Sequence, residues 1–501
     1  MSLAWVDTRA SLGLDAPGVR VEVHLSPGLP GLTIVGLPET GVRESKDRVR
    51  SALLNSGLEF PGQRITINLA PADLPKEGSR FDLPIALGIL AASGQIPAGR
   101  LAALCCLGEL ALSGALRPVS GVLTASLAAR DHGATLLVPQ GNAAEAALPP
   151  QSRVLTAGSL SEVVAYLRGQ RELPAPAATP VPVGQAPGPD LASVRGQHQA
   201  RRALEIAAAG GHSLLLHGPP GAGKTLLASC LPGLLPALDL NAQLEVTAIH
   251  SLAGSPRGLD ATPPCRSPHH RTGSVALIGG GSGIPRPGEI SLAHGGVLFL
   301  DELPEFGRQA LESLREPLES GEVVISRSRR QVRYPARFQL VAAMNACPCG
   351  PHGQPGSCRC TPEQLARYRA RVSGPLLDRM DLRAAVAPVE VHQLQDSGAP
   401  AESSACVRER VRRARERQMS RQGTLNARLD GNALADGLNA TTRLFMQRAG
   451  ERLGLSARGY HRVLRVALSI ADLADRTGID VGAVAEALTL RGLPGGQGAG
   501  G

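Results

Sequence analysis

The chain has 501 residues, more than one hydrophobic core usually supports, so its length predicts two or three domains. Aromatic residues make up only 2% of it, which argues against a base-stacking surface, while the formal net charge of +9 suits a polyanionic partner. No segment approaches the roughly 18 apolar residues of a membrane span, and the sequence does not open on a basic and then apolar leader. We therefore expect a cytoplasmic protein with no membrane partner.

The chain divides by composition into five segments. Residues 1–170 mix short β-rich runs with Ala/Leu segments at helical spacing, which predicts an α/β or α+β domain. Residues 171–190, RELPAPAATPVPVGQAPGPD, predict an extended linker. Residues 191–390 are expected to form a second α/β domain around a glycine loop. Helical periodicity over 391–493 predicts an all-helical domain, and residues 494–501 are expected to form a disordered tail.

Lysine is almost absent from the chain. Of 52 basic residues, only Lys46, Lys76 and Lys224 are lysine, so a retained lysine suggests a role that the broader guanidinium cannot fill. For Lys76 the alternatives are a phosphate or backbone contact in the first domain and a plain surface position. For Lys224 the surrounding sequence indicates a phosphate site.

The stretch SLLLHGPPGAGKT begins as an apolar strand and matches the phosphate-loop pattern G-x-x-x-x-G-K-[ST], followed by a helical segment. Glycines in such a loop let backbone N–H groups approach phosphate oxygens. The predicted ATP-binding residues are Gly218, Pro219, Pro220, Gly221, Ala222, Gly223, Lys224 and Thr225. Lys224 would neutralise the β- and γ-phosphates and Thr225 would ligate Mg²⁺. The flanking strand and helix argue against a chance glycine turn.

Two more apolar strands end in polar residues. GVLFLDELPEF predicts a buried strand whose Asp301 and Glu302 emerge beside the phosphate loop. We expect Asp301 to help bind ATP by holding Mg²⁺, and Glu302 to polarise the attacking water. Without the loop, the pair would be an ordinary helix cap. FQLVAAMNA delivers Asn345, whose amide is predicted to orient that water or to sense the γ-phosphate.

Arg379 follows a short helical segment in SGPLLDRMD, away from the phosphate loop. The γ-phosphate bound by a neighbouring subunit is the kind of target that needs a projecting arginine, so we predict a catalytic role for Arg379. A surface ion pair with Asp378 or Asp381 is the simpler alternative.

Four cysteines form a C-x-C-x₈-C-x-C pattern at Cys347, Cys349, Cys358 and Cys360. The Gly/Pro loop between the two pairs is long enough to fold back and present four thiolates, which predicts a structural Zn²⁺ knuckle over residues 347–360. A reduced loop without metal is the alternative. Cys265, His269 and His270 lack a carboxylate partner nearby in sequence, so we interpret them as structural residues rather than metal ligands.

Arginines cluster in GEVVISRSRRQVRYPARF, which predicts a β-hairpin. The predicted DNA-binding residues at or near its tip are Arg327, Arg329, Arg330 and Arg333. Clustered arginine binds backbone phosphates without regard to sequence. A second basic segment, VRERVRRARERQMSRQ, fits DNA contact and a solvated, ion-paired helix equally well.

Together these motifs resemble the magnesium-chelatase-like AAA+ ATPases, and specifically the YifB/ComM family. The resemblance spans nearly the whole chain and includes GLPETGVRESKDRVRSAL, ITINLAPADLPKEGSRFDLPIALGIL, EPLESGEVVISR, YPARFQLVAAMNACPCG and LLDRMD. It implies an α+β domain similar to the ribosomal S5 domain 2-like, Lon-protease-like fold, a central AAA+ module with a helix-2 insert, and a C-terminal helical lid. It also implies a homo-hexameric ring in which Arg379 acts in trans.

The resemblance carries further expectations for single residues. Arg458 looks like the lid arginine that touches ATP, with Arg462 as the competing candidate. The arginine hairpin resembles an element that faces the central channel, with the glycine loop 279–286 beside it. Arg80 stands where a Lon-like protease would carry its serine, so Ser79 and Lys76 are not expected to form a protease dyad.

The resemblance therefore implies an ATP-hydrolysing motor on single-stranded or branched DNA, namely a branch-migration helicase in homologous recombination and natural transformation. A regulatory or protein-remodelling ATPase is the alternative. Metal insertion of the magnesium-chelatase type is less favoured, because those ATPase subunits are expected to lack this N-terminal domain and the cysteine knuckle.

Overall fold

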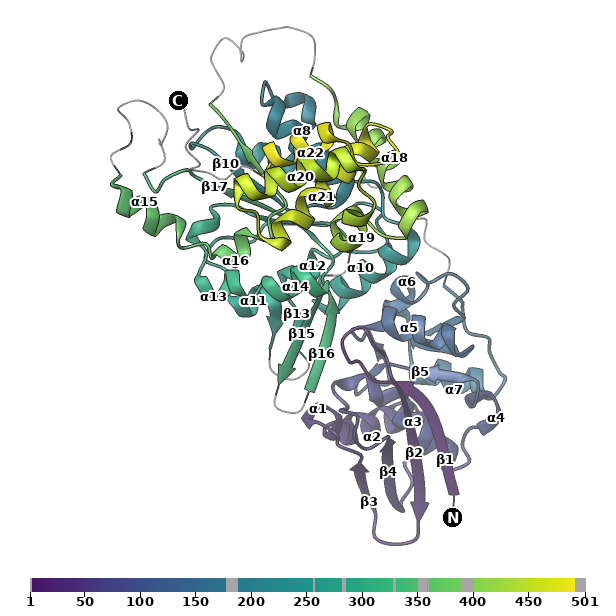
Figure 1. Cartoon of the computed structure of the whole chain (residues 1–501). Helices are drawn as coiled ribbons and strands as arrows, with labels where there is room; N and C mark the ends of the chain where they lie inside the picture. Colours follow the sequence, from purple (N-terminus) through teal and green to yellow (C-terminus); the bar gives the residue numbers. More distant parts are fainter. Residues whose placement is uncertain are drawn as a thin grey trace.

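The computed structural model describes residues 2–176, 188–255, 257–281, 285–327, 330–349, 358, 360–388 and 401–491. The molecule is elongated, with the N-terminal sheet at one end and the C-terminal helices at the other (Figure 1). The predicted tail 494–501 and most of the predicted linker lie outside the described residues. Within the described ranges, no helix is both long and apolar enough to cross a membrane.

A seven-stranded mixed sheet organises the N-terminal part, in the order β3-β4-β2-β1-β5-β8-β9. Its strands are β1 (Ser2–Arg9), β2 (Gly18–Ser26), β3 (Gly31–Val35), β4 (Arg64–Ala70), β5 (Leu104–Cys106), β8 (Thr135–Pro139) and β9 (Val154–Ala157). Burial alternates along β2, where Val19, Val21 and Val23 are buried and their neighbours are more exposed. At β2 this period of two places one face of the sheet on a core and leaves the other face more exposed, whereas β5, β8 and β9 have a core on each face.

Helices cover one face of this sheet and, over β5, β8 and β9, the other face as well. They are α1 (Thr40–Arg43), α2 (Ser45–Asn55), α3 (Asp82–Ala92), α4 (Ala98–Leu101), α5 (Val122–Asp131), α6 (Ala143–Ala146) and α7 (Leu160–Leu167), with a small ribbon of β6 (Glu109–Leu110) and β7 (Leu116–Arg117). Helix α3 is buried along nearly its whole length and lies against β1 and β2. Leu, Ile, Val and Ala side chains form most of this core, as the low aromatic content requires.

A five-stranded, fully parallel sheet forms the centre of the molecule, in the order β11-β14-β17-β10-β18. Its strands are β10 (Leu214–His217), β11 (Cys265–Arg266), β14 (Val297–Leu300), β17 (Gln339–Met344) and β18 (Leu382–Ala385). Leu214 packs into one core and Leu215 into another, so the apolar runs are buried on both faces. The mixed α/β fold with a parallel sheet that the sequence predicts is confirmed.

Helices and two hairpins surround the parallel sheet. The helices are α8 (His198–Gly210), α9 (Lys224–Cys230), α10 (Leu240–Leu252), α11 (Ser274–Ile278), α12 (Glu289–Leu292), α13 (Arg308–Glu312), α14 (Arg315–Ser320), α15 (Pro362–Arg369) and α16 (Gly374–Leu377). The hairpins are β12 (Gly279–Gly280) with β13 (Arg286–Pro287), and β15 (Glu322–Arg327) with β16 (Arg330–Pro335). The predicted arginine hairpin is therefore present.

The C-terminal helices share a core with one face of the parallel sheet. They are α18 (Ser404–Gln422), α19 (Gly431–Asp436), α20 (Ala440–Leu453), α21 (Ala457–Leu473) and α22 (Val481–Thr489). Val411 of α18 and Val463 of α21 belong to the same buried cluster as Leu214. Apolar packing therefore attaches these helices to the sheet directly.

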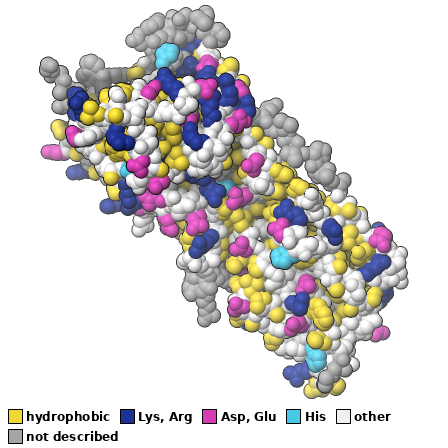
Figure 2. Space-filling view, turned by 45° about the vertical axis from the view of Figure 1, so that its right-hand side comes forward, with side chains coloured by type: hydrophobic (Ala, Val, Ile, Leu, Met, Phe, Trp, Pro, Cys, Tyr) yellow, Lys and Arg dark blue, Asp and Glu magenta, His cyan; other side chains and the backbone are white. Residues whose placement is uncertain are grey.

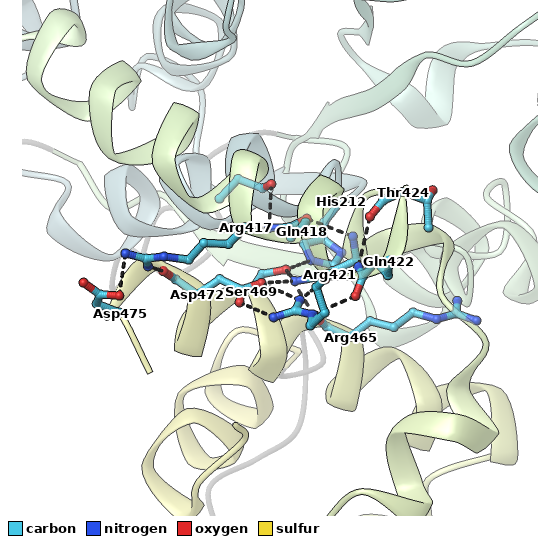
Figure 3. Close-up of polar contacts among 12 residues, drawn as sticks. His212, Arg417, Gln418, Arg421, Gln422, Thr424, Arg465, Ser469, Asp472 and Asp475 are labelled. Carbon is cyan, nitrogen blue, oxygen red and sulfur yellow. Dashed lines mark hydrogen bonds and ion pairs between the residues drawn. The ribbon is translucent and has the colours of Figure 1, made fainter. Parts of the chain in front are cut away.

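A buried polar network fixes the same junction (Figure 3). Asp472, which is 1% exposed, accepts hydrogen bonds from Arg421 at 2.7 Å and from the amide of Asn426 at 2.7 Å. Ser469 Oγ contacts His212 Nε2 at 2.7 Å and accepts from Asn426 at 3.0 Å. Such a network favours a single arrangement of its side chains, because each buried polar group needs its partner for a hydrogen bond. It sets the angle of α18 and α21 relative to the sheet.

A tight turn of the N-terminal part packs against hairpin β15–β16. Leu12 and Leu14 join the cluster that contains Val332, and the turn closes through reciprocal backbone hydrogen bonds between Leu12 and Asp15. Gly13 has a φ of +61°, and a Cβ there would lie 2.5 Å from Val332 Cγ1. Because of this positive φ and this short distance, only glycine fits both the backbone conformation and the close approach. Figure 1 shows the hairpin pointing along the N-terminal sheet.

We expect Gly13→Ala to lower the melting temperature more than Gly57→Ala does. Both glycines have positive φ, +61° and +73°, but a Cβ at Gly57 meets nothing within 4 Å. The two substitutions therefore carry a similar backbone penalty. The clash with Val332 adds about 1–3 kcal/mol of destabilisation to Gly13→Ala alone. Thermal unfolding of the two variants measures the difference, and equal midpoints would contradict the packing of this turn on the hairpin.

Candidate nucleotide-binding site

The phosphate-loop sequence forms the junction between β10 and α9. Gly218 approaches the neighbouring strand so closely that a Cβ would lie 2.1 Å from the Val386 carbonyl oxygen. Gly221 and Gly223 have φ values of +73° and +91°, with open space where a Cβ would stand. The glycines thus permit a sharp turn and keep side chains out of the concave side of the loop, which is the cradle that phosphate oxygens need.

Lys224 begins α9 and is 8% exposed. Its ammonium donates to the carbonyls of Gly218 at 3.0 Å and Pro219 at 2.8 Å, and to Asn345 Oδ1 at 2.9 Å. Burial lowers the pKa of Lys224, although the charge of Asp301 acts in the opposite direction. The structure therefore brings Lys224 and Asn345 together although they are far apart in sequence, because β10 and β17 are parallel neighbours.

Thr225 and Asp301 also meet at this edge. The Thr225 hydroxyl donates to Asp301 Oδ2 at 2.7 Å, and Asp301 Oδ1 accepts from the backbone N–H of Glu302 at 2.9 Å. A hydroxyl beside a carboxylate is an oxygen donor set that suits Mg²⁺, which prefers one or two protein oxygens plus water and phosphate. These residues therefore fit the predicted ATP and Mg²⁺ site.

Glu302 is held in an unusual conformation. Its backbone lies in the left-handed region, with φ 52° and ψ 46°, which a non-glycine residue seldom adopts. Its carboxylate Oε2 lies 3.0 Å from His270 Nδ1. We interpreted His270 from sequence as a structural residue, and this contact was missed. The signal that could have found it is that His270 follows a strand, β11, which runs parallel to and beside β14, the strand that Asp301 follows.

Arg379 and Arg458 are not near the phosphate loop of their own chain. Both line a cavity of about 870 Å³ together with Ser213, Phe338 and Asp381. These last three residues lie at the amino ends of β10, β17 and β18, whereas the phosphate loop and Asn345 lie at the carboxyl ends. Four to six residues of strand separate the two edges, roughly 13–20 Å. Within one chain, neither arginine reaches its own phosphate site.

Arg379 is less exposed than a projecting arginine would be. It is 7% exposed and pairs with Glu319 of α14, and its guanidinium donates to the Pro375 carbonyl at 2.8 Å. The ion pair with Asp378 or Asp381 that the sequence offered as an alternative is replaced by this pair with Glu319. Arg379 is therefore held at the wall of the cavity, next to the surface formed by α14.

Arg462 links the cavity to the C-terminal helices. It donates to the Arg379 carbonyl at 2.9 Å and forms an ion pair with Asp381. Burial tends to raise the pKa of Asp381, but His212 and the charge of Arg462 outweigh burial and hold that pKa below its ordinary value. Both lid candidates, Arg458 and Arg462, line the cavity, and the ion pair with Asp381 holds Arg462 at its wall.

The four cysteines of the predicted knuckle converge. Their sulfur atoms all lie within 4.8 Å of one another, with Cys347 to Cys349 at 3.2 Å and Cys349 to Cys358 at 3.6 Å. Four sulfurs around a tetrahedral Zn²⁺ with bonds of about 2.3 Å would be separated by about 3.8 Å. The set, completed by Cys360, therefore fits a closed structural zinc site two residues after Asn345.

The predicted DNA-binding arginines lie on hairpin β15–β16. Arg327 and Arg330 are paired across it, next to the turn, while their side chains and all of Arg329 lie outside what the structure describes. The side chain of Arg333 is 65% exposed and 3.6 Å from Glu322. Val332 and Tyr334 alternate with it and are buried. The hairpin thus has an apolar inner face and carries Arg333 outward.

The second basic segment, α18, is an ion-paired and packed helix. Arg412 pairs with Glu409 and Glu416, and Arg410 pairs with Glu205. Arg415 donates to the Ala208 carbonyl, and burial lowers its pKa to about 10. Figure 2 shows basic and acidic side chains intermixed over this end of the molecule. The structure therefore favours the ion-paired interpretation over DNA contact.

The residues at the Lon-like position have structural contacts. Lys76 is fully buried and donates to the Pro71 carbonyl, which matches the backbone contact that its retention suggested. Ser79 donates to Glu109, and Arg80 donates to the Ser120 carbonyl. Burial lowers the pKa of Arg80 to about 10. Ser79 and Lys76 are therefore bound to different partners and form no dyad.

Models of three protein families match the chain. The model described as "Magnesium chelatase, subunit ChlI" matches residues 190–394, "Subunit ChlI of Mg-chelatase" matches residues 21–142, and "Magnesium chelatase, subunit ChlI C-terminal" matches residues 401–491.

Curated relatives match over nearly their whole length. The chain is 52% identical to "Uncharacterized protein YifB" of Escherichia coli K12 over 477 residues, which is 94% of each chain. It is 50% identical to "Competence protein ComM" of Haemophilus influenzae over 504 residues, 98% of each chain. It is 46% identical to "Uncharacterized protein Rv2897c" of Mycobacterium tuberculosis, covering 98% of this chain and 99% of that protein. The chain therefore belongs to the YifB/ComM family of magnesium-chelatase-like AAA+ ATPases.

Proposed function

We propose that this protein is a ring-forming ATPase that moves along DNA and drives branch migration during homologous recombination. The observation that carries the proposal is the separation of two half-sites on one subunit. The phosphate loop, Asp301 and Asn345 lie at the carboxyl edge of the parallel sheet, while Arg379 and Arg458 line a cavity at the amino edge. A complete site then needs the cavity of one subunit against the phosphate loop of the next.

Each residue at the carboxyl edge has a role in this proposal. Lys224 would neutralise the β- and γ-phosphates of ATP, and Thr225 and Asp301 would hold Mg²⁺, which supplies charge stabilisation when bound. Glu302 would polarise the attacking water, and Asn345 would orient it, since its amide already meets Lys224. The arginines of the neighbouring subunit would stabilise charge that develops on the transferred group.

Head-to-tail contacts of this kind close into a ring when the rotation between subunits permits it. We propose a homo-hexamer, as the family resemblance implies. The same resemblance assigns the N-terminal part to the S5 domain 2-like fold, and we propose domain limits of 1–170, 191–390 and 391–493 with a helix-2 insert in the middle unit.

The DNA contact rests on charge and placement. Hairpin β15–β16 carries Arg333 outward, and the relative from Haemophilus influenzae is a competence protein by name. Arginine clusters on a hairpin bind phosphates regardless of sequence, as a motor that moves along DNA requires. Single-stranded or branched DNA that enters the ring would then be held there by this hairpin.

Mixing two inactive variants tests the shared site. Lys224→Ala lacks the phosphate contact and Arg379→Ala lacks the arginine, so each homo-oligomer is expected to lose ATPase activity. In mixed rings, an intact phosphate loop can face an intact arginine at about one quarter of the interfaces. ATPase activity should therefore reappear on mixing. The same recovery is expected when Arg458→Ala, in place of Arg379→Ala, is mixed with Lys224→Ala.

The control is a single chain that carries both Lys224→Ala and Arg379→Ala, mixed with Lys224→Ala. That mixture contains no intact phosphate loop and should stay inactive. If the first mixture were as inactive as this control after subunit exchange, the arginines would not act across an interface.

Alanine at Arg327, Arg329, Arg330 and Arg333 is expected to leave ATPase activity without DNA unchanged and to abolish its stimulation by DNA. Each lost phosphate contact should also reduce the slope of log K against log salt by roughly 0.7 for single strands. The control replaces the exposed arginines Arg117, Arg171, Arg413 and Arg476, which removes the same charge elsewhere. An equal loss of DNA stimulation in both variants would show that only net charge matters.

The four cysteines are proposed to hold structural Zn²⁺, which would fix the chain that leaves β17 after Asn345. Cys349→Ser should remove the metal and lower the melting temperature, by roughly 2–4 °C per kcal/mol lost, with little change in nucleotide affinity. Cys406→Ser, at an exposed cysteine on α18, is the control. Metal analysis should find one zinc per wild-type chain, and its absence from carefully purified protein would refute the site.

A further inference from the structure

The backbone carbonyl of Arg379 is held by two side chains to which the proposed reaction gives no role. Ser213 Oγ donates to this carbonyl at 2.6 Å, and Arg462 donates to it at 2.9 Å. Ser213 lies directly before β10 and Arg462 lies on α21, so the sheet and a C-terminal helix reach the same oxygen. The peptide that carries Arg379 is therefore fixed from two directions.

Asp381 joins these two side chains. Its carboxylate forms an ion pair with Arg462 and accepts from the Ser213 N–H at 3.1 Å, while its own N–H donates to Ser213 Oγ at 2.9 Å. His212 is fully buried and brings its Nδ1 to 3.6 Å from the same carboxylate. Asp381 is itself buried, so water competes little for these charge-assisted contacts, and each partner restricts the others.

The guanidinium of Arg379 is held less completely than its backbone. It donates to the Pro375 carbonyl at 2.8 Å and pairs with Glu319, whose side chain is 52% exposed. The Nε of Arg379 is buried and has no hydrogen-bond partner among the residues that the structure describes. A phosphate oxygen can therefore replace Glu319 while the buried contacts of the peptide stay in place. The peptide contacts then determine where the guanidinium stands at the cavity wall.

Helix α21 presents Arg462 from a fixed position. Val463, next to it in sequence, packs into the core of the parallel sheet. Ser469, two turns further along α21, contacts His212 Nε2 at 2.7 Å. Arg458, one turn before Arg462, is exposed and lines the same cavity. Arg458 is thus presented to a ligand, whereas Arg462 is bound to the chain itself.

We infer that Arg462 is a positioning residue for Arg379. Through Asp381 and the Arg379 carbonyl, it sets where the guanidinium faces the ATP of the neighbouring subunit, and it does not contact nucleotide itself. This inference rests on the proposed function, because it assumes that Arg379 acts across a subunit interface. It gives the two lid arginines different roles: Arg458 contacts nucleotide, and Arg462 supports Arg379. A shift of α21 in one subunit would then change the rate of hydrolysis in the next.

The first test measures ATP hydrolysis by the full-length protein without DNA. Arg462→Gln should lower kcat about tenfold to a hundredfold, the cost of misplacing a catalytic group by about 1 Å, and leave KM for ATP nearly unchanged. Arg462→Lys should restore most of kcat, because one nitrogen of Arg462 makes both contacts and an ammonium has donors for both. An arginine that bound phosphate through its planar fork would not be replaced by lysine in this way.

Arg202→Gln is the control for a general effect on the C-terminal helices. Arg202 of α8 pairs with Glu486 of α22 at 2.8 Å, so this variant also removes an ion pair between a C-terminal helix and the domain of the sheet. The partners of Arg202 are Glu486 and Glu205 rather than the peptide of Arg379. Its kcat should therefore equal that of the wild type.

Mixed rings test on which side of the interface Arg462 acts. Arg462→Gln keeps an intact phosphate loop and Lys224→Ala keeps an intact Arg379, so mixing them should recover activity at about one quarter of the interfaces. Mixing Arg462→Gln with Arg379→Ala should recover nothing, because both variants lack the same half of the site. The opposite pattern would show that Arg462 serves the nucleotide of its own subunit, and it would overturn the inference.

Melting temperatures identify a variant that fails to fold. If Arg462→Gln unfolds because Asp381 is left as an unpaired buried charge, the double variant Arg462→Met with Asp381→Asn removes both charges and takes its place in the same mixtures. Wild-type kcat in the folded variant, or an Arg462→Lys variant as slow as Arg462→Gln, would also overturn the inference.

The mixture of Lys224→Ala with Arg379→Ala separates the two levels of the account. If that mixture recovers no activity, the shared site of the proposed function fails and the inference fails with it. If that mixture recovers activity and the Arg462 variants give the opposite pattern, only the inference fails.

Discussion

The direction of five parallel strands determines what this subunit can and cannot do alone. Because every strand of the central sheet points the same way, all strand exits lie at one edge and all strand entries at the other. Lys224, Asp301 and Asn345 sit at the exits, and Arg379 sits just before an entry. The distance between these edges is fixed by backbone geometry, so no side-chain rearrangement can join them within one chain. The chemistry of hydrolysis is therefore expected to depend on assembly.

The same geometry explains why the C-terminal helices contribute to the arginine cavity. Val463 of α21 packs into the sheet core, and Arg462 on that helix ties Asp381 and the Arg379 backbone together. His212 extends the connection to Ser469 and the buried network around Asp472 (Figure 3). A change in the angle of α21 would therefore move Arg379 and Arg458 together. In the proposed ring, this continuity would give a physical route between neighbouring sites, although the groups lie far apart in sequence.

Motifs in consecutive residues could be predicted from sequence. The phosphate loop follows an apolar strand and precedes a helix, so the position of Lys224 and Thr225 followed from local pattern. Asp301 and Asn345 followed because apolar runs of parallel strands end at one edge. The arginine hairpin was also predictable, from the alternation of apolar and polar residues along its strands. The mixed α/β fold was predictable as well. The four cysteines were predictable as a cluster because their spacing allows the chain to fold back on itself.

Features set by long-range contacts could not be predicted from sequence. Glu319 as the partner of Arg379 depends on how α14 packs beside the turn before β18. The contact of His270 with Glu302 depends on which strand lies next to β14. The arginines of α18 could bind DNA or pair with glutamates, and only packing against α8 shows that several are paired or buried. In each case the sequence supplied the chemical group, and the tertiary neighbour determined its surroundings.

The most direct measurement of the central claim is strand exchange on a synthetic four-way DNA junction, followed with ATP, without ATP, and with Glu302→Gln in place of the wild type. The account predicts that the wild type converts the junction to its duplex products only when ATP is hydrolysed, and that Glu302→Gln binds ATP and the junction but does not convert it. Conversion at the same rate without ATP, or by Glu302→Gln with ATP, would contradict it.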